Sequence, residues 1–139
     1  TELELVRALY EQSAITALHV AEFDGTVVGY NIYATGTCSS SDARVEGLTI
    51  MGMHPLVQRR GWGTELLSWS VQRMRHCCDA LIVLGHSNFY SRAGFRPVHE
   101  LGLRFAIPAP PEACMALCCS PHAPTEGVLD YHPIVARFC

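Results

Sequence analysis

The stretch between residues 45 and 84 restricts the possible folds of this chain more than any other segment. A run typical of a strand, from Val45 to Met53, stops before Pro55, because proline cannot donate a hydrogen bond inside a sheet. A turn with two glycines follows, and apolar residues then recur every three to four positions, which predicts a helix over 63–77. The next segment, 80–84, is wholly apolar, as in a strand that is buried on both faces. The order is therefore strand, glycine turn, helix and buried strand.

The residues before this stretch predict one helix and two antiparallel strands. Apolar residues at helical spacing predict a helix over 2–13. Strands are expected at 17–23 and 26–34, joined by the two-residue turn Asp24-Gly25 that is typical of hairpins. The serine-rich stretch 36–42 is expected to form a polar loop.

The residues after this stretch predict shorter elements. A short helix over 88–93 is expected to end at Gly94, since glycine readily adopts the left-handed conformation that closes a helix. Further strands are expected at 96–99 and 114–119, and the proline-rich stretch 108–111 is expected to be a rigid loop.

Together these elements predict an α/β fold of the mixed α+β kind, with a mostly antiparallel sheet and flanking helices. The chain has 139 residues, which is the size of one domain and enough to bury a core. Neither a linker nor an internal repeat is visible, so a single domain over 1–139 is expected. The chain opens within a helical pattern and without Met, which suggests that upstream residues are absent.

The composition argues against several classes of partner. A net charge of -3 gives no reason to expect nucleic acid or an anionic membrane. No apolar stretch approaches the ~20 residues that span a bilayer, and the first residues lack the order of a secretory signal. Seven irregularly spaced cysteines do not suit a disulfide framework, so we interpret them as reduced, mostly buried residues of a cytoplasmic protein. They are Cys38, Cys77, Cys78, Cys114, Cys118, Cys119 and Cys139.

The glycine turn has the composition of a phosphate-binding loop. Residues 58–64 read Gln-Arg-Arg-Gly-Trp-Gly-Thr. Glycine adopts backbone angles that other residues avoid, and it lets a ligand approach the main chain closely. A helix that begins at such a turn directs unpaired N–H groups and about half a positive charge outward, and this arrangement binds phosphate. Because Arg59 and Arg60 add cationic charge, the turn predicts a ligand that carries phosphate groups.

The same residues resemble the signature of the GNAT N-acetyltransferases. That signature is Gln or Arg, two residues, Gly, one residue, then Gly or Ala at the start of a helix. Gln58, Gly61 and Gly63 occupy these positions, and Met53 and Pro55 match the residues found just upstream in the family.

A second feature of the family is a Tyr four residues before a Gly-Phe pair, matched here by Tyr90 and Gly94-Phe95. The segments 83–90 and 130–133 are similar to those of a subfamily of predicted bacterial acetyltransferases. The resemblance covers about residues 17–133, most of the chain.

The resemblance implies the GNAT acyl-CoA N-acyltransferase fold without its first strand and helix. It also implies acetyl-CoA as co-substrate, and direct attack by a primary amine of a small molecule or peptide in a ternary complex. In the family the strand before the turn runs beside the pantetheine arm, so Met51 and Met53 are expected to contact the coenzyme. The pyrophosphate is expected to bind at Gln58, Arg59, Arg60, Gly61, Trp62, Gly63 and Thr64.

The resemblance also assigns candidate catalytic residues. Tyr90 corresponds to the residue that contacts the coenzyme and protonates the leaving sulfur, and a phenol remains protonated at neutral pH. Glu46 lies where some relatives keep a carboxylate that deprotonates the amine through water. Both residues also have a purely structural explanation, Tyr90 as a core aromatic and Glu46 as an exposed strand residue. His54 stands at the far end of the same strand, and Val83 replaces an Asn that contacts the coenzyme in many family members.

Two other functions remain open from the sequence. One is an acyl-CoA-binding module of the same fold without catalysis. The other is a metal or redox protein, suggested by the cysteine and histidine residues at 76–78 and 114–122. Adjacent cysteines are poor chelators because neighbours on a helix or strand point apart, so no metal site is expected. The resemblance is also compatible with a homodimer, although the sequence does not determine the oligomeric state.

Overall fold

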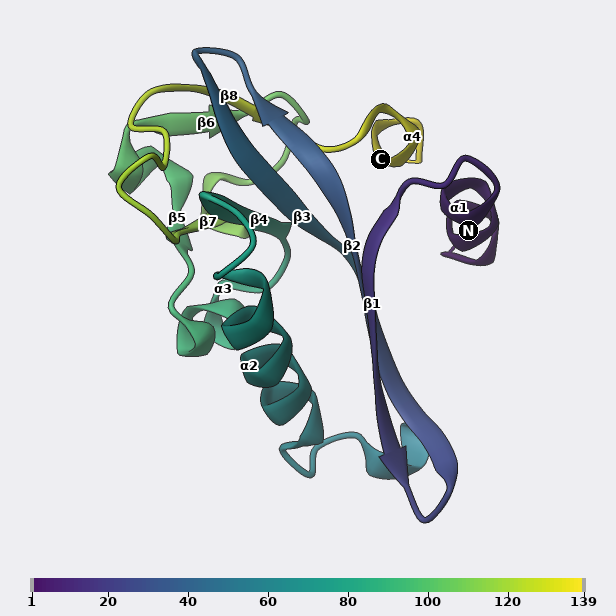
Figure 1. The fold of residues 1–139 in the computed structure, drawn as a ribbon. Helices are drawn as coiled ribbons and strands as arrows, with labels where there is room; N and C mark the ends of the chain where they lie inside the picture. The colour runs from purple at the N-terminus through teal and green to yellow at the C-terminus, as the bar shows by residue number, and fades with distance from the viewer. Residues whose placement is uncertain (1, 139) are drawn as a thin grey trace.

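The computed structural model describes residues 2–138 as one curved sheet with helices on both faces (Figure 1). The strand order is β5-β7-β4-β3-β2-β8-β6, and β1 pairs with β2 beside this path. Most neighbouring strands are antiparallel, whereas β3–β4 and β6–β8 are parallel. The mixed, mostly antiparallel sheet that the sequence predicted is therefore confirmed.

Helices and strands are interleaved along the chain. Short 3-10 helices, labelled η, connect several of them. In chain order they are α1 (Glu2–Glu11), β1 (Ile15–Phe23), β2 (Thr26–Cys38), β3 (Ser41–Met53), η1 (Pro55–Val57), α2 (Trp62–Met74), β4 (Ala80–Leu84), α3 (Ser87–Tyr90), η2 (Ser91–Ala93), β5 (Arg96–Pro97), η3 (Val98–Leu101), β6 (Leu103–Phe105), η4 (Pro111–Ala113), β7 (Cys114–Cys118), β8 (Gly127–Asp130) and α4 (Pro133–Ala136).

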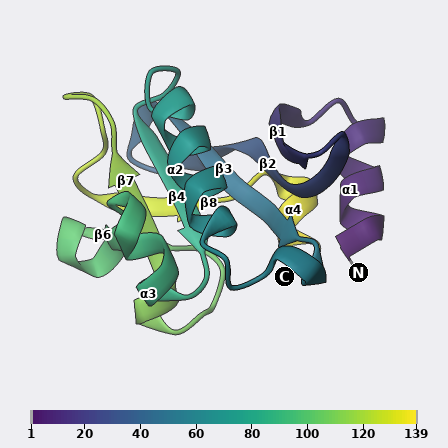
Figure 2. The ribbon, with the colours of Figure 1, turned by 90° about the horizontal axis from the view of Figure 1, so that it is seen from below.

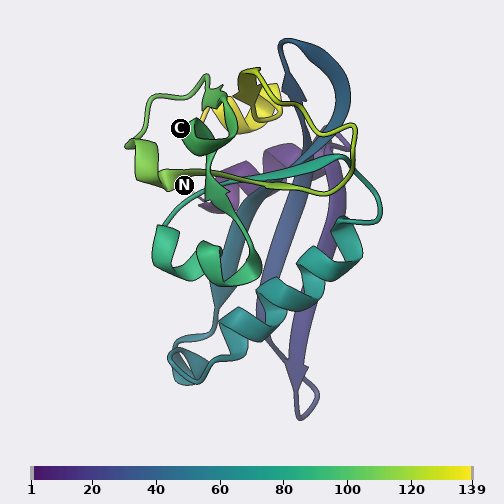
Figure 3. The same cartoon turned by 90° about the vertical axis from the view of Figure 1, so that its left-hand side faces the viewer.

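The helices divide between the two faces of the sheet. Figure 2 shows α1 and α4 together on one face, while α2 and α3 lie on the other. Strand residues alternate between these layers, as the period of a strand requires. Ile32 and Ile82 belong to the core under α1 and α4, whereas Tyr33 and Leu81 belong to the core under α2. Figure 3 shows α2 running obliquely across its face of the sheet.

The central unit is the strand–helix–strand that the sequence predicted. Helix α2 and strand β4 lie where they were expected, although α2 ends at Met74, three residues early. Strand β3 pairs with β4 in parallel from Val45–Ala80 to Leu48–Val83. An irregularity at Thr49 then shifts the pairing with β2, and β3 continues to Met53 without β4 beside it. Residues 49–53 therefore leave β4 before they reach the glycine turn.

The first hairpin is longer than expected. Strand β2 continues to Cys38 and β3 begins at Ser41, so the polar loop predicted at 36–42 is wrong. The reason is a distant partner, since β8 pairs with the end of β2. The two-residue turn is fixed to the same strand because Ser39 Oγ accepts a hydrogen bond from the Val128 amide at 2.9 Å.

The C-terminal part combines confirmed and missed elements. Helix α3 and η2 occupy the predicted range 88–93 within one residue, and Gly94 closes them at φ 100°. Strand β5 has only two residues, because a 3-10 turn begins at Val98. Strands β6 and β8 and helix α4 were not predicted.

The cysteines were expected to be mostly buried. Cys38, Cys78 and Cys114 are buried, whereas Cys77 and Cys118 are exposed, so the expectation holds for only part of the set. All six cysteines between residues 2 and 138 are free thiols, and Cys139 lies outside the described residues. Within the same range, no group of three or more His, Cys, Asp or Glu residues is arranged to hold a metal ion. None of the described helices is both long and apolar enough to cross a membrane.

Candidate functional site

The turn between β3 and α2 is held by its own polar groups. The Nδ1 atom of His54 accepts a hydrogen bond from the Leu56 amide at 3.1 Å and so caps η1. The side-chain amide of Gln58 donates to the Met53 carbonyl at 3.1 Å. Gln58 therefore ties the end of β3 to the turn. The His54 side chain also takes part in a hydrogen bond within the turn, which gives it a structural role at this position.

Two residues of the turn adopt the left-handed conformation. Arg59 has φ 68° and Gly61 has φ 81°. A side chain makes this conformation costly, by about 1 kcal/mol or more, and Gly61 avoids that cost as the N-cap of α2. Arg59 and Arg60 are both exposed.

The N-terminus of α2 lacks a side-chain cap. The first amide to close a helical hydrogen bond is that of Glu65, which donates to the Gly61 carbonyl at 3.1 Å. The amides of Trp62, Gly63 and Thr64 precede it and have no partner within the helix. Three N–H groups and the positive end of the helix dipole therefore point away from the helix at this turn. This arrangement suits a negatively charged group that can accept several hydrogen bonds.

The packing of the surrounding protein does not require glycine at positions 61 and 63. A Cβ atom at Gly61 would meet no heavy atom within 4 Å. A Cβ atom at Gly63 would lie 3.5 Å from Met53, 3.8 Å from Phe89 and 3.9 Å from Met51, which are ordinary contact distances. Packing alone would thus tolerate alanine at Gly63. The structure brings Met51, Met53 and Gly63 together, with Phe89 beside them.

Tyr90 is held beside the end of β4 by three neighbours. Its ring lies 5.0 Å from the ring of Phe89 and 6.0 Å from that of Phe95. A methyl group at Gly85 would stand 2.5 Å from Tyr90 Cε2, so Gly85 has to be glycine for the ring to lie there. Burial raises the pKa of the Tyr90 phenol above its ordinary value. Its hydroxyl has no hydrogen-bond partner among the described residues, and it remains protonated at neutral pH.

Glu46 is fully buried, so the reading as an exposed strand residue is wrong. Its Oε2 atom accepts hydrogen bonds from Thr35 Oγ1 at 3.0 Å and from Arg44 Nε at 3.4 Å. The Oε1 atom has no partner within the described part of the chain. A buried carboxylate oxygen without a partner is costly and often marks a functional group.

Glu46 and Tyr90 are not direct neighbours. Glu46 pairs with Leu81 in the sheet, and Gly85, which contacts Tyr90, is four residues further along the chain. At about 3.3 Å per residue this separates the two positions by roughly 13 Å. Any proton transfer between Glu46 and a group beside Tyr90 would therefore need intervening waters.

The fold and the turn agree with one family. A family model described as an acetyltransferase (GNAT) domain matches residues 14–97, more than half of the chain. The chain therefore belongs to the GNAT acetyltransferase family. One relative is the uncharacterized N-acetyltransferase YjhQ of Escherichia coli (strain K12), which is 30% identical over 117 residues. The match covers 80% of this chain, and the chain spans only 65% of that relative's length.

Solved structures show the same fold. The GNAT family N-acetyltransferase YhbS from Escherichia coli, in complex with CoA, has a TM-score of 0.88 at 24% identity and covers 98% of this chain and 78% of its own. A GNAT acetyltransferase from Brucella melitensis, in complex with acetyl-CoA, has a TM-score of 0.75 at 25% identity, with 94% and 75% covered. A mutant of the AtaT toxin, bound to the C-terminus of the antitoxin AtaR and acetyl-CoA, has a TM-score of 0.58 at 17% identity, with 83% and 74% covered.

Proposed function

We propose that this chain binds acetyl-CoA and transfers the acetyl group to a primary amine by direct attack in a ternary complex. The observation that carries the proposal is the uncapped start of α2 at Gly61, open to solvent and flanked by two exposed arginines. Family membership and the CoA complexes of structural relatives support acetyl-CoA as the ligand. Six free thiols also suit a reducing compartment such as the cytoplasm.

The pyrophosphate would occupy the turn 58–64. The amides of Trp62, Gly63 and Thr64 donate to its oxygens, and each charged hydrogen bond contributes about 1.5–3 kcal/mol. Arg59 and Arg60 approach the phosphates from solvent. Gln58 holds the turn against β3 through its hydrogen bond to Met53. The role of Gln58 is therefore to position the turn, while the backbone amides bind.

The pantetheine arm would run from this turn along Met51 and Met53, in the space that Gly63 leaves open beside Phe89. This path leads toward the end of β4, where Tyr90 lies against Gly85. A thioester placed here comes within reach of a phenol that is protonated and has no other hydrogen-bond partner in the described structure. Because β4 does not continue beside residues 49–53, backbone groups of β3 are available to the arm.

The reaction follows from these placements. The neutral amine attacks the thioester carbonyl carbon, the C–S bond breaks, and the electron pair leaves with sulfur. Tyr90 donates its proton to that sulfur and later recovers one from solvent, while the ammonium formed on the acceptor loses a proton. Glu46 would take a proton from the bound substrate ammonium through water and so supply the neutral amine, since its Oε1 atom has no hydrogen-bond partner among the described residues. Holding amine and thioester together supplies much of the acceleration, because effective molarities reach about 10⁵ M or more.

The acceptor is proposed to be an amine of a small molecule or peptide, and a homodimer is compatible with this proposal. The net charge of -3 still argues against nucleic acid as a partner. Structural relatives do not decide this point, because an AtaT–AtaR complex has been solved bound to DNA.

Coenzyme binding is tested with Gly61→Glu, which places a carboxylate and bulk at the proposed pyrophosphate site. Isothermal titration with CoA should give binding to the natural chain and none to the variant. Gly25→Glu is a matched control, because Gly25 also has positive φ (79°) and open space around its Cβ position. The control carries the same strain and charge in the hairpin turn and should keep most of the affinity. An equal loss of CoA affinity in both variants would contradict the placement of the pyrophosphate at this turn.

Transfer is tested separately by the release of free CoA thiol from acetyl-CoA with a panel of primary amines. Amine-dependent release of CoA thiol that exceeds the hydrolysis of acetyl-CoA supports the proposed acetyl transfer. Tight CoA binding without release for any amine would instead favour a binding module without catalysis.

A further inference from the structure

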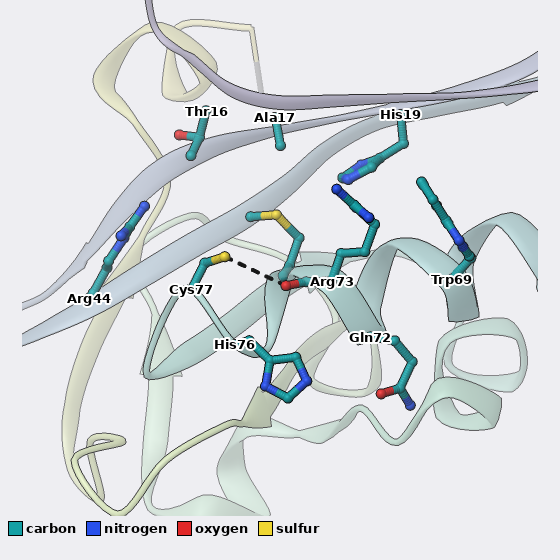
Figure 4. A pocket seen from close by; sticks show the side chains of 10 residues that line it. Thr16, Ala17, His19, Arg44, Trp69, Gln72, Arg73, His76 and Cys77 are labelled. Atoms are coloured by element: carbon teal, nitrogen blue, oxygen red, sulfur yellow. Dashed lines mark hydrogen bonds between the residues drawn. The ribbon is translucent and has the colours of Figure 1, made fainter.

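A pocket lies on the same face of the sheet as α2, between β1 and the C-terminal half of that helix (Figure 4). Its volume is about 540 Å³, within the roughly 300–1,000 Å³ of small-molecule sites. Apolar surface comes from Ala17, Trp69 and Met74. None of the residues proposed to bind the coenzyme lines it, so the pocket is separate from the turn at 58–64.

The pocket contains a buried histidine in a fixed orientation. His19 is 8% exposed, and its Nδ1 atom lies 2.9 Å from Asn31 Oδ1. Asn31 in turn donates through Nδ2 to Ser70 Oγ at 2.9 Å, which fixes the orientation of its amide. His19 Nδ1 is therefore the protonated donor, because its partner is an oxygen that only accepts. The other ring nitrogen, Nε2, has no hydrogen-bond partner among residues 2–138.

The network below His19 is complete and rigid. Ser70 Oγ donates to the Leu67 carbonyl at 3.0 Å, and it lies 3.0 Å from the Tyr33 hydroxyl. With its own proton used, Ser70 accepts from both Asn31 and Tyr33. Asn31, Tyr33 and Ser70 are each fully buried. A satisfied buried network of this kind holds its members in one arrangement, so His19 presents Nε2 at a defined position.

Positive charge faces this histidine across the pocket. The guanidinium of Arg73 lies 4.9 Å from the centre of the Trp69 ring and reaches toward His19 (Figure 4). No carboxylate or hydrogen-bond acceptor pairs with Arg73 in the described part of the chain. Two arginines, Arg44 and Arg73, and two histidines, His19 and His76, line the pocket, and no Asp or Glu does. The Trp69 ring stands next to His19, with their centres 5.4 Å apart.

We propose that this pocket binds a small organic carboxylate with a flat apolar body. The carboxylate would pair with the guanidinium of Arg73, which has no hydrogen-bond acceptor among the described residues, and this is the strongest type of hydrogen bond available there. The apolar body would pack against Trp69, Ala17 and Met74. His19 Nε2 would accept a hydrogen bond from a donor on the ligand. The site lies beyond the proposed acetyl transfer and does not depend on it.

The test uses benzoate as the probe and nuclear magnetic resonance of the uniformly ¹⁵N-labelled chain. Millimolar benzoate should shift the amides around His19 and the Trp69 indole, and should leave the amides of 61–64 unchanged. Benzyl alcohol, which has the same ring without the charge, should bind at least about tenfold more weakly, as the loss of a charged hydrogen bond predicts. Arg73→Met should weaken benzoate by a similar factor, whereas Arg137→Met, an exposed arginine on the other face, should change nothing.

Three outcomes would overturn the proposal. The first is that benzoate at the limit of its solubility shifts no amide resonance around His19. The second is shifts confined to 61–64, which would place the anion at the start of α2 instead. The third is that benzyl alcohol binds as tightly as benzoate, or that Arg73→Met binds benzoate as tightly as the natural chain does. Either result would leave an apolar pocket without selectivity for charge.

Discussion

The placement of Tyr90 can be tested without touching its phenol, by the substitution Gly85→Ala. The added methyl would stand 2.5 Å from Tyr90 Cε2 and 3.3 Å from Cδ2. The backbone of Gly85 cannot easily yield, since its amide donates to the Ala113 carbonyl at 3.0 Å. The ring must therefore move by something near an ångström, against Phe89 and the buried Phe95. Overpacking of this kind costs about 1–3 kcal/mol.

A displacement of about 1 Å in a reacting group lowers turnover by roughly 10²-fold. We therefore expect kcat to fall by one to two orders of magnitude in the thiol-release assay. The melting temperature should fall by roughly 2–8 °C per kcal/mol lost. CoA affinity should change less than kcat, because the atoms nearest to the added methyl belong to Tyr90 and not to the turn at 58–64.

The control is a double-mutant cycle with Tyr90→Phe. If Gly85→Ala acts by moving the phenol, its effect on kcat should largely disappear when Tyr90 is already Phe. An undiminished effect in the Tyr90→Phe background, or full activity of Gly85→Ala, would refute the assignment of the acid to Tyr90.

Three further predictions follow from the site and its surroundings. Tyr90→Phe alone should lower kcat while leaving CoA affinity within about twofold by titration, and equal turnover would remove Tyr90 as the acid. Glu46→Gln should lower kcat/KM most at low pH, where less of the amine is neutral, and an unchanged pH profile would exclude Glu46 as the base. Burial raises the pKa of Tyr33 to about 12 from its ordinary value of 10.0. Because the folded chain holds this proton more tightly, the free energy of unfolding should fall as pH rises from about 10 to 12, and Tyr33→Phe should flatten that decline in denaturant titrations.

The parts of the fold that the sequence predicted are those that local rules determine. Pro55 ends a strand, Gly61 and Gly94 adopt positive φ, and Ala80–Leu84 is too apolar for a surface. Each of these depends on residues within one or two turns of chain. The glycine turn was therefore identified, together with the helix that it begins.

The missed parts depend on partners far away in the chain. The turn at Ser39–Ser40 exists because β8, almost 90 residues later, extends the hairpin. Strand β6 has three residues and acquires its conformation from β8. Periodicity detects neither, because so few residues carry too little pattern.

The candidate site also combines residues that local sequence identifies with residues that depend on distant partners. The turn residues and Tyr90 follow from spacing, whereas the burial of Glu46 and its hydrogen bonds from Thr35 and Arg44 depend on the tertiary fold. The network beneath His19 joins β1, β2 and α2 across distances that no motif spans. A signal was present in part, since Asn31 and Ser70 are polar residues at positions whose neighbours are apolar.

The strand order also has a consequence for the time at which the protein becomes functional during synthesis. The meander β1–β2–β3 forms from consecutive segments, so it can assemble as soon as they leave the ribosome. The strands that flank it come last, since β7 covers β4 on one side and β8 covers β2 on the other. A nascent chain that stops before residue 114 already holds the glycine turn and Tyr90, but its β4 lacks one neighbour. Residues 114–130 therefore supply the strands that complete the pairing of β4 and β2.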